Sequence, residues 1–461
     1  MPDGLRGFKS RLHNRLARIR PIKMGWLTFI PSILWVRAQL RIGELEKRIA
    51  LQSDWPNGQR AESKPETQRR SVVFVHNAYY NFFYLAQALR ARGWDAISVS
   101  VEDPASPVYQ FYHGEDLNLY DSDPERYAQN LSAFLEEIPD RFKMLHFYGM
   151  GRMALHPDRF DGAYPHEFFD KLPKDFLFLK QIGVKIGYTT SGCNDGVAQS
   201  TFREWSKGCC DLCVFQNDPQ VCSDRRNLAW GHKVATFVDL FATEGNAAND
   251  YQGIEAAVQV PVTSALDADV WHPELVIPEQ WKIERGDAEM LIYHSVGNFR
   301  DRSDGTRNIK GTHAIIEAVD RMVSEGLKVR LEFRTGVDSI NVRYVQAQCD
   351  VVIDQIVFGR YGSTAREGMM LGKPVISRID PTEPNGRPVL EHLKECPIIS
   401  ADVDSICQVL KDLYSDSERR RVVGQKSREF ALKWHSKEAC AERFEVIYDS
   451  LIAGDAGYQN H

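Results

Sequence analysis

Residues 350–376 read DVVIDQIVFGRYGSTAREGMMLGKPVI, the most informative stretch of the chain. The apolar run up to Asp354 predicts a buried strand, and Gly359 and Gly362 mark the loop that follows it. A helix is expected to begin at Ser363–Thr364, before the final PVI run predicts the next strand. A strand, a glycine-containing loop and a helix start together present backbone N–H groups to a phosphate.

Glu367 lies on the first turn of this predicted helix. A glutamate at this place can hold the two hydroxyl groups of a ribose by two hydrogen bonds. A structural alternative exists, because Thr364-x-x-Glu367 is also the pattern of a capping box, in which the glutamate caps its own helix. The residues alone leave both interpretations open.

The alternation of apolar runs and helices continues on both sides and predicts two α/β domains. For residues 71–270, strands are expected at 71–76, 96–101, 143–147, 184–188 and 212–215, and a helix at 81–91. For residues 271–461, strands are expected at 291–296, 328–333, 351–353 and 374–377, and helices at 311–325, 417–434 and 436–451. The expected fold is two Rossmann-like domains joined by the segment 261–273.

Composition supports a globular protein with a separate basic arm. The 461 residues are 43% hydrophobic and 26% charged, which excludes a mainly disordered chain, and the net charge of -6 argues against a nucleic-acid binder. Residues 1–50 carry eleven Lys/Arg and three Asp/Glu, a charge of +8, so the rest of the chain carries -14. Residues 1–70 are therefore expected to form a basic amphipathic helical arm and a polar linker.

The arm alternates basic and apolar residues, which is typical of a helix on an anionic membrane surface. The alternative is a solvated helix that pairs with the acidic body. The apolar stretch 24–35 is too short to span a bilayer and contains Pro31, and no cleavage site of a signal peptide follows it. Nine cysteines, an odd number, fit a reducing compartment. We expect a cytoplasmic protein, peripheral to the inner face of the membrane.

The stretch from Gly359 to Ile376 resembles the donor-site signature of GT-B glycosyltransferases, in particular the retaining family 4 (group 1). Residues 308–319 (NIKGTHAIIEAV) are similar to the family's Lys-Gly and the helix after it, and residues 260–273 to the segment that enters its second domain. The resemblance covers the second domain well and the first domain only in architecture. It implies two facing Rossmann-like domains, with a nucleotide-sugar bound mainly by the second and an acceptor by the first.

The resemblance also implies roles for individual residues. Lys310 would contact the donor diphosphate with Arg307 beside it, and Glu367 would bind the ribose. The remaining donor-site candidates are the backbone N–H groups of Gly362, Ser363 and Thr364 and the side chains of His294 and Asn298. Lys310 and a helix N-terminus would stabilise the charge that develops on the leaving diphosphate. No metal-ligand motif lies near these residues, so neither a metal nor a cofactor is expected.

One position departs from the family's pattern. A second glutamate commonly stands eight residues before the ribose-binding one, near the transferred sugar, and here that position is Gly359. The expected activity is transfer of a sugar from a nucleotide donor to a glycan, a lipid-linked or another acceptor, as in polysaccharide biosynthesis, with retention. The alternatives are a catalytically silent relative that acts as a binding or scaffold subunit, and a nucleotide-sugar epimerase of the same fold.

Two residues of the first domain are candidates for the acceptor side. His146 is expected at the carboxyl end of a strand, facing the cleft, where it could contact acceptor or sugar and take part in catalysis. A hydrogen-bonded structural histidine is the alternative. Asp195 follows another predicted strand. The segment 149–154 mimics a dinucleotide fingerprint, but Pro157 comes too soon for the required helix, so NAD binding is not expected.

Five cysteines lie within residues 193–222, at positions 193, 209, 210, 213 and 222. Their spacing lacks the paired Cys-x2-Cys pattern of zinc sites, although a zinc site remains an alternative. Buried free thiols are the default interpretation.

Overall fold

The computed structural model describes residues 70–454, except 76–78, 107–108, 110–113, 150–178, 191, 194, 207, 244–249, 252, 255, 260–263, 298–309 and 380–390. The predicted basic arm therefore lies outside the described residues. Within them, no helix has the length and apolar character needed to cross a membrane.

Seven described strands form the first sheet. In spatial order they are β3 (Leu117–Asn118), β2 (Asp95–Ser100), β1 (Ser71–Val75), β4 (Met144–Tyr148), β5 (Lys185–Thr189), β6 (Leu240–Thr243) and β7 (Ala257–Gln259). All neighbouring pairs are parallel. The helices of this region are α3 (Asn81–Ala91), α4 (Pro124–Arg141), α6 (Gln199–Ser206) and α7 (Asp224–Phe237). The strand order reverses between β1 and β4.

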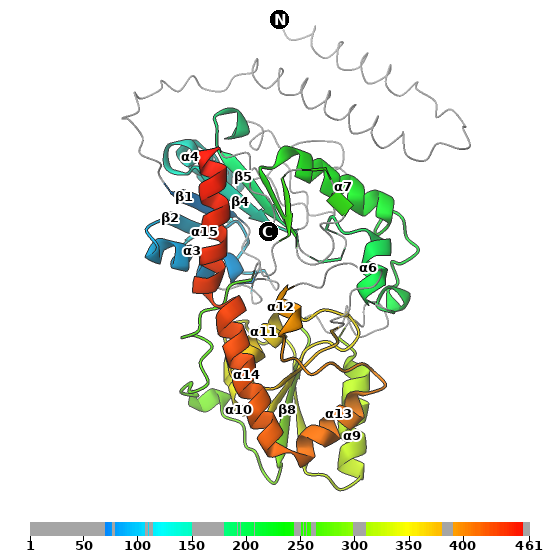
Figure 1. Ribbon diagram of the computed structural model, residues 1–461. Helices are drawn as coiled ribbons and strands as arrows, with labels where there is room; N and C mark the ends of the chain where they lie inside the picture. Colours follow the sequence, from blue (N-terminus) through cyan, green and yellow to red (C-terminus); the bar gives the residue numbers. More distant parts are fainter. Residues whose placement is uncertain are drawn as a thin grey trace, which may run out of the picture. The chain divides into compact units, whose positions relative to one another are not determined.

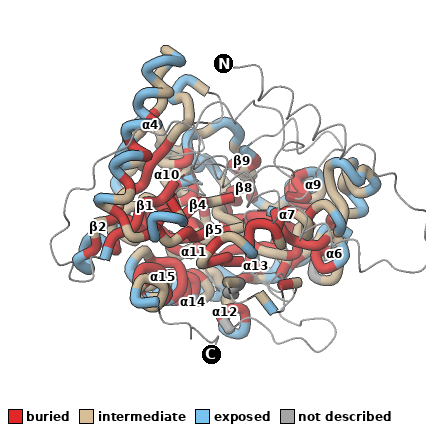
Figure 2. Tube along the Cα trace, turned by 90° about the horizontal axis from the view of Figure 1, so that it is seen from above, coloured by how far each residue is buried: buried red, intermediate tan, exposed pale blue. Residues whose placement is uncertain are grey.

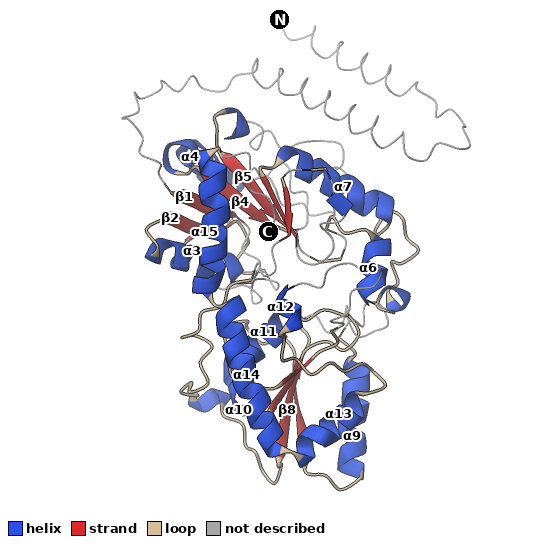
Figure 3. Ribbon diagram, viewed as in Figure 1, coloured by secondary structure: helices blue, strands red, loops and turns tan. Residues whose placement is uncertain are grey.

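The second sheet is smaller and also parallel (Figure 3). Its described strands, in spatial order, are β11 (Val375–Ile376), β10 (Val351–Ile353), β8 (Met290–Ser295) and β9 (Val329–Arg334). The helices are α9 (Thr312–Ser324), α10 (Val342–Gln348), α11 (Ser363–Met370), α12 (Glu391–Lys394), α13 (Ile406–Ser415), α14 (Ser417–His435) and α15 (Lys437–Ala453). Here the strand order reverses between β8 and β10.

The last helix returns to the first domain. α14 packs on α11 of the second domain, whereas α15 packs on α3 (Figure 1). Ser436 lies between the two helices with an extended backbone, and its hydroxyl accepts a hydrogen bond from the N–H of Ala439, which caps α15. The sequence-based prediction placed both helices with the second domain and gave no sign of this return.

One hydrophobic cluster joins the two domains. It contains Phe74 and Leu85 of the first domain, the fully buried Trp271 of the connecting segment, and Tyr293 and Met369 of the second. Figure 2 shows β1, β4 and β5 buried, while α4 alternates buried and exposed residues. Burying one large apolar side chain contributes about 2 kcal/mol, so this shared cluster is a major part of the contact between the domains.

The predicted architecture of two Rossmann-like α/β domains is confirmed, with strand boundaries displaced by about one residue. The predicted strand at 212–215 is wrong. This segment holds a short 3-10 helix, Cys210–Leu212, followed by turns. Leu212 and Val214 are each 51% exposed, so the apolar run covers no core. β6 and β7, which sequence analysis missed, complete the sheet instead.

Candidate functional site

The reversal of strand order in the second sheet defines the candidate site. Ligands of open parallel sheets bind beyond the carboxyl ends of the strands at such a reversal. His294 of β8 lies opposite Ile353 of β10 in the parallel register, so the chain leaves both strands at the same edge. Lys310 precedes α9, and Asp354 leads from β10 toward α11. Two helix starts therefore follow the two strands at the reversal.

Lys310 and Asp354 form a buried ion pair at this edge. Lys310 Nζ is 2.5 Å from Asp354 Oδ1, and the two side chains are 10% and 0% exposed. The other carboxylate oxygen accepts a hydrogen bond from the N–H of Gly362 at 2.5 Å. An ammonium group has three N–H donors, so Lys310 has donating capacity beyond the bond to Asp354. Asp354 thus holds Lys310 beside the start of α11.

α11 begins at Ser363 and has Gly362 as its N-cap residue, without a side-chain cap. The N–H of Arg366 donates to Gly362 O at 3.2 Å, which makes it the first N–H of the helix with an intrahelical acceptor. The N–H groups before it, including those of Ser363 and Thr364, have no intrahelical acceptor, as in the first turn of any α-helix. The predicted phosphate-binding residues therefore lie at a helix N-terminus, and their role stays a prediction.

Glu367 is 5% exposed and accepts two hydrogen bonds from neutral donors. Tyr80 Oη donates to Oε1 at 2.5 Å, and Gln346 Nε2 donates to Oε2 at 2.8 Å. Burial raises the pKa of Glu367 to about 7, although the bonds from Tyr80 and Gln346 act in the opposite direction. The negative charge of Asp354 adds to the rise, and the positive charge of Lys310 opposes it.

The capping-box alternative for Glu367 is wrong. α11 starts four residues before Glu367, which places this residue beyond the first turn. Its carboxylate accepts from side chains of α10 and of the first domain, while the N-cap residue Gly362 donates to Asp354. The Glu367 carboxylate therefore does not cap the N-terminus of its own helix.

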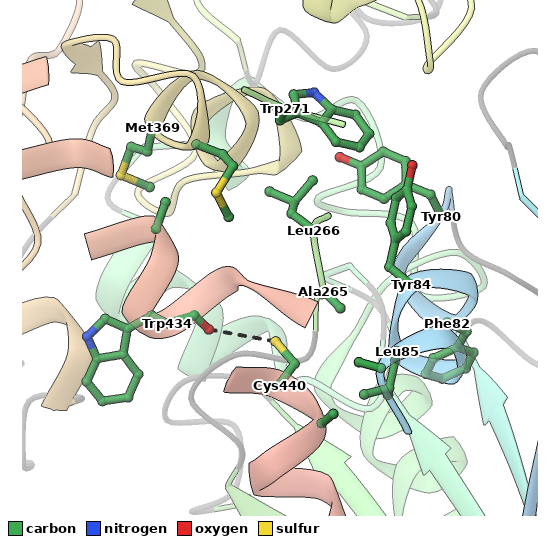
Figure 4. Packing of buried hydrophobic residues seen from close by; sticks show 14 of the residues in the cluster. Tyr80, Phe82, Tyr84, Leu85, Ala265, Leu266, Trp271, Met369, Trp434 and Cys440 are labelled. Carbon is green, nitrogen blue, oxygen red and sulfur yellow. Dashed lines mark hydrogen bonds between the residues drawn. The ribbon is translucent and has the colours of Figure 1, made fainter. Parts of the chain in front are cut away.

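Sequence analysis missed three residues of this site: Asp354, Gln346 and, farthest away in the sequence, Tyr80. Tyr80 precedes α3 in the first domain and is 2% exposed. Its ring packs against Trp271 and Tyr84, with centroid distances of 5.0 and 5.7 Å (Figure 4). The preceding residue, Tyr79, has a φ of 61°, a left-handed conformation uncommon outside glycine. The sequence offers no local signal for a partner 287 residues away.

His294 lies at the reversal point, but its ring is used within the protein. Nδ1 is 3.0 Å from Ile353 O, and Nε2 is 3.0 Å from Thr312 Oγ1. A carbonyl only accepts, so Nδ1 carries the proton and Nε2 accepts from the hydroxyl of Thr312. Burial lowers the pKa of His294 to about 4, which keeps the ring neutral. His294 thus ties β8 to β10 and to the first residue of α9.

His146 does not face an open cleft as expected. The side chain is fully buried, Nδ1 lies 2.6 Å from Tyr448 Oη of α15, and Nε2 lies 2.9 Å from Thr189 Oγ1. Burial lowers its pKa to about 3. The return of α15 covers this histidine, a feature that local sequence cannot reveal. The structural alternative fits its surroundings, and His146 has no part in the mechanism below.

Asp195 is also enclosed in the first domain. It is 1% exposed and accepts hydrogen bonds from Tyr188 Oη at 2.7 Å and Trp230 Nε1 at 3.0 Å. Its neighbours are thus structural groups of the domain core, and its predicted contact with the acceptor gains no support from them.

Two predicted donor residues, Asn298 and Arg307, lie outside the described residues.

Gly359 has a φ of +83°, a left-handed conformation, so a glutamate at this position would strain the backbone. All nine cysteines are free thiols. In the part of the chain that the structure describes, no three His, Cys, Asp or Glu side chains are placed to hold a metal ion.

No protein-family model and no curated protein matches the sequence. The structure is similar to a sucrose-phosphate synthase from Thermosynechococcus elongatus, with 14% identity over 84% of this chain and 100% of that one, at a TM-score of 0.49. It is also similar to a glycosyltransferase from Rickettsia africae, with 12% identity over 83% of this chain and 99% of that one, at a TM-score of 0.49. A third similar structure is HepE from Anabaena in complex with UDP, with 10% identity over 83% of this chain and 100% of that one, at a TM-score of 0.47. Similarities of this size assign neither a family nor an activity.

Proposed function

We propose that the protein is a glycosyltransferase that takes its sugar from a nucleoside-diphosphate donor bound at the carboxyl edge of the second sheet. The observation that carries this proposal is Glu367, a buried carboxylate whose hydrogen-bond donors among the described residues are neutral. It lies on α11, whose start adjoins the Lys310–Asp354 pair. In this arrangement the ribose of the donor would bind the Glu367 carboxylate. The diphosphate would bind Lys310 and the N–H groups at the start of α11.

The chemistry follows from the leaving group. Transfer breaks the bond between the anomeric carbon and the diphosphate oxygen, whose electron pair stays with the diphosphate. The acceptor hydroxyl oxygen forms the new bond to the anomeric carbon, and its proton passes to the departing diphosphate. Negative charge thus grows on the diphosphate. Lys310 and the N–H groups of Ser363 and Thr364 would stabilise it, and the ion pair with Asp354 would keep the ammonium group in position. We propose that this stabilisation operates without a metal ion.

The finer parts of the proposal rest on the sequence resemblance. They are a family 4-like enzyme, retention at the anomeric carbon, and a glycan or lipid-linked acceptor bound by the first domain. The charge of +8 on residues 1–50 supports a peripheral contact with an anionic membrane on the cytoplasmic side.

Nucleotide binding is the first test. UDP, GDP, ADP and CDP are titrated into the full-length protein by calorimetry and thermal shift, and at least one is expected to bind and raise Tm. Lys310→Met should weaken that binding at least tenfold. The matched control is Lys437→Met, because Lys437 forms a similarly buried pair with Asp267, with side chains 18% and 10% exposed. Equal losses in both variants, or no binding by the wild type, would contradict the proposed site.

Turnover is the second test and separates the alternatives. The wild type is incubated with the sugar form of whichever nucleotide binds, and free nucleotide and sugar products are followed with and without candidate acceptors. Release of nucleotide, stimulated by an acceptor and lost in Lys310→Met, is the expected result. Interconversion of the donor sugar without nucleotide release would instead identify an epimerase. Nucleotide binding without turnover of any sugar nucleotide would identify a silent binding protein.

A further inference from the structure

The contact between Tyr80 and Glu367 joins the first domain to the proposed nucleotide site. The two residues are 287 positions apart, both are buried, and their oxygens are 2.5 Å apart. This places an O–H donor of the protein on the same carboxylate that the proposed function assigns to a ribose diol.

Tyr80 reaches this carboxylate from an aromatic cluster. Its ring lies between Trp271 and Tyr84, and burial raises the pKa of the phenol, with a further rise from the neighbouring carboxylate of Glu367. The hydroxyl therefore stays protonated and donates. On the other side, Gln346 already donates to Oε2 of Glu367. The Tyr80 bond and the Gln346 bond thus use one acceptor position on each carboxylate oxygen.

We propose that the Tyr80 hydroxyl occupies the place of one ribose hydroxyl on Glu367 and so sets how strictly the site requires a ribose. This inference rests on the proposed function. When a ribonucleotide binds, its hydroxyl replaces Tyr80 at Oε1, and one hydrogen bond to the carboxylate is exchanged for another. When the nucleotide lacks that hydroxyl, Tyr80 keeps its bond and Glu367 remains satisfied. Tyr80 is therefore a specificity-determining residue.

The energetic consequences have definite signs. In the wild type, the ribose hydroxyl gains little at Oε1 of Glu367, because the bond from Tyr80 is broken when the bond from the ribose forms. In Tyr80→Phe the acceptor position on Oε1 that Tyr80 occupied is empty. The ribose hydroxyl therefore forms this hydrogen bond without breaking another. A hydrogen bond to a charged group corresponds to about a tenfold change in affinity or more. The deoxynucleotide lacks this partner and gains nothing from the substitution.

The experiment compares UDP, GDP and ADP with their 2′-deoxy and 3′-deoxy forms by calorimetry on full-length wild type, Tyr80→Phe and Tyr84→Phe. We expect Tyr80→Phe to bind the recognised ribonucleotide about tenfold more tightly, and to bind one of its deoxy forms with wild-type affinity. Discrimination against that deoxy form should therefore rise about tenfold. Tyr84→Phe is the control, because it removes a hydroxyl from the same aromatic cluster, and none of these affinities should change.

Two results would overturn the inference. Weaker ribonucleotide binding by Tyr80→Phe would mean that Tyr80 and the ribose share Glu367, and an unchanged ratio of ribo to deoxy affinity would mean that the ribose does not meet this oxygen. The wild type provides a second measurement that needs no variant: its affinities for the ribo form and for that deoxy form should differ less than threefold. If the wild type binds no nucleotide at all, the proposed function fails; if it binds but the ratios disagree, only the role of Tyr80 fails.

Discussion

Glu367 and Glu445 are two buried glutamates, 5% and 9% exposed, that connect the C-terminal half of the chain to the first domain. Glu445, on α15, accepts hydrogen bonds from Arg70 at 2.9 Å, from Arg92 Nε at 2.7 Å and from Trp94 Nε1 at 3.1 Å. Burial alone would raise its pKa, but the bonds from Arg92 and Trp94 and the charges of both arginines offset this, and the net pKa is lowered. The charge of this carboxylate is therefore balanced by two arginines of the first domain.

Glu367 is the opposite case. It too accepts from an aromatic side chain of the first domain, yet its hydrogen-bond donors in the described part of the chain are both neutral, and its pKa is raised to about 7. A contact that only held two domains together could pair the carboxylate with arginines, as Glu445 does. Burying a carboxylate without its own cation costs stability, and such costs are typical of binding sites.

The largest expected difference concerns nucleotide affinity. In the Tyr80→Phe background, where the ribose forms its bond without displacing Tyr80, Glu367→Ala removes the acceptor of the proposed ribose contact and should weaken binding of the recognised nucleoside diphosphate about tenfold, the effect of losing one hydrogen bond to a charged group. Glu445→Gln should change it less than twofold, since Glu445 is engaged with arginines. Calorimetry on both variants measures this contrast. Equal losses would show that the variants act through a common disturbance of the domains.

The next expected effect is the pH dependence of the free energy of unfolding that Glu367 causes. The pKa of Glu367 is higher in the folded protein, at about 7, than its ordinary value of 4.5, so the folded state binds the proton more tightly. This contribution to stability is present in full below pH 4.5 and is lost as pH rises to about 7, a total of about 3 kcal/mol.

Glu367→Gln tests this directly, because it removes the titrating group and keeps the side-chain size. Urea unfolding of wild type and variant at pH 5 and pH 8 should show the variant gaining stability relative to wild type at the higher pH. A parallel pH dependence of the two proteins would show that Glu367 does not titrate in this range.

A smaller effect is expected at the ion pair. Glu445→Gln removes the negative charge that faces Arg70 and Arg92 and should lower the free energy of unfolding by about 2 kcal/mol at neutral pH. The signs of the two glutamine variants are therefore opposite at pH 8, where Glu367→Gln should be more stable than wild type. Urea unfolding at that pH, on both variants, decides whether the two glutamates differ as described.

The sequence predicts part of this comparison and not the rest. The strands at Ser71–Val75 and Val351–Ile353 are continuous apolar runs, so local pattern suffices to find them. Glu367 was a candidate because of its place after a glycine loop. Its partner Tyr80 was not, because the contact exists only once two domains and a connecting segment have folded together.

The same reason explains why the role of α15 was missed. Its sequence is that of an ordinary charged helix, and neither composition nor periodicity says which domain it covers. Only its packing on α3 brings Glu445 to Arg92 and Tyr448 to His146. Prediction of a cleft histidine failed for this reason, since a covering helix 300 residues away leaves no mark on the strand that it covers.

The smallest expected effect separates the two arginines of the ion pair. Arg70 is 46% exposed and also contacts Asp449, so solvent and salt screen its charge. Arg70→Ala should therefore lower the free energy of unfolding by only about 0.5–1 kcal/mol, and 1 M NaCl should remove most of that difference. Urea unfolding at low and high salt measures it. Arg92 donates from both Nε and Nη2 to the same oxygen of Glu445, Oε2, so Arg92→Ala should cost more and keep part of its cost in salt. If Arg70→Ala lowers the free energy of unfolding as much as Arg92→Ala does, Glu445 depends equally on both arginines. The contrast between Glu445 and Glu367 would then come from the total positive charge near Glu445 and not from the geometry of Arg92.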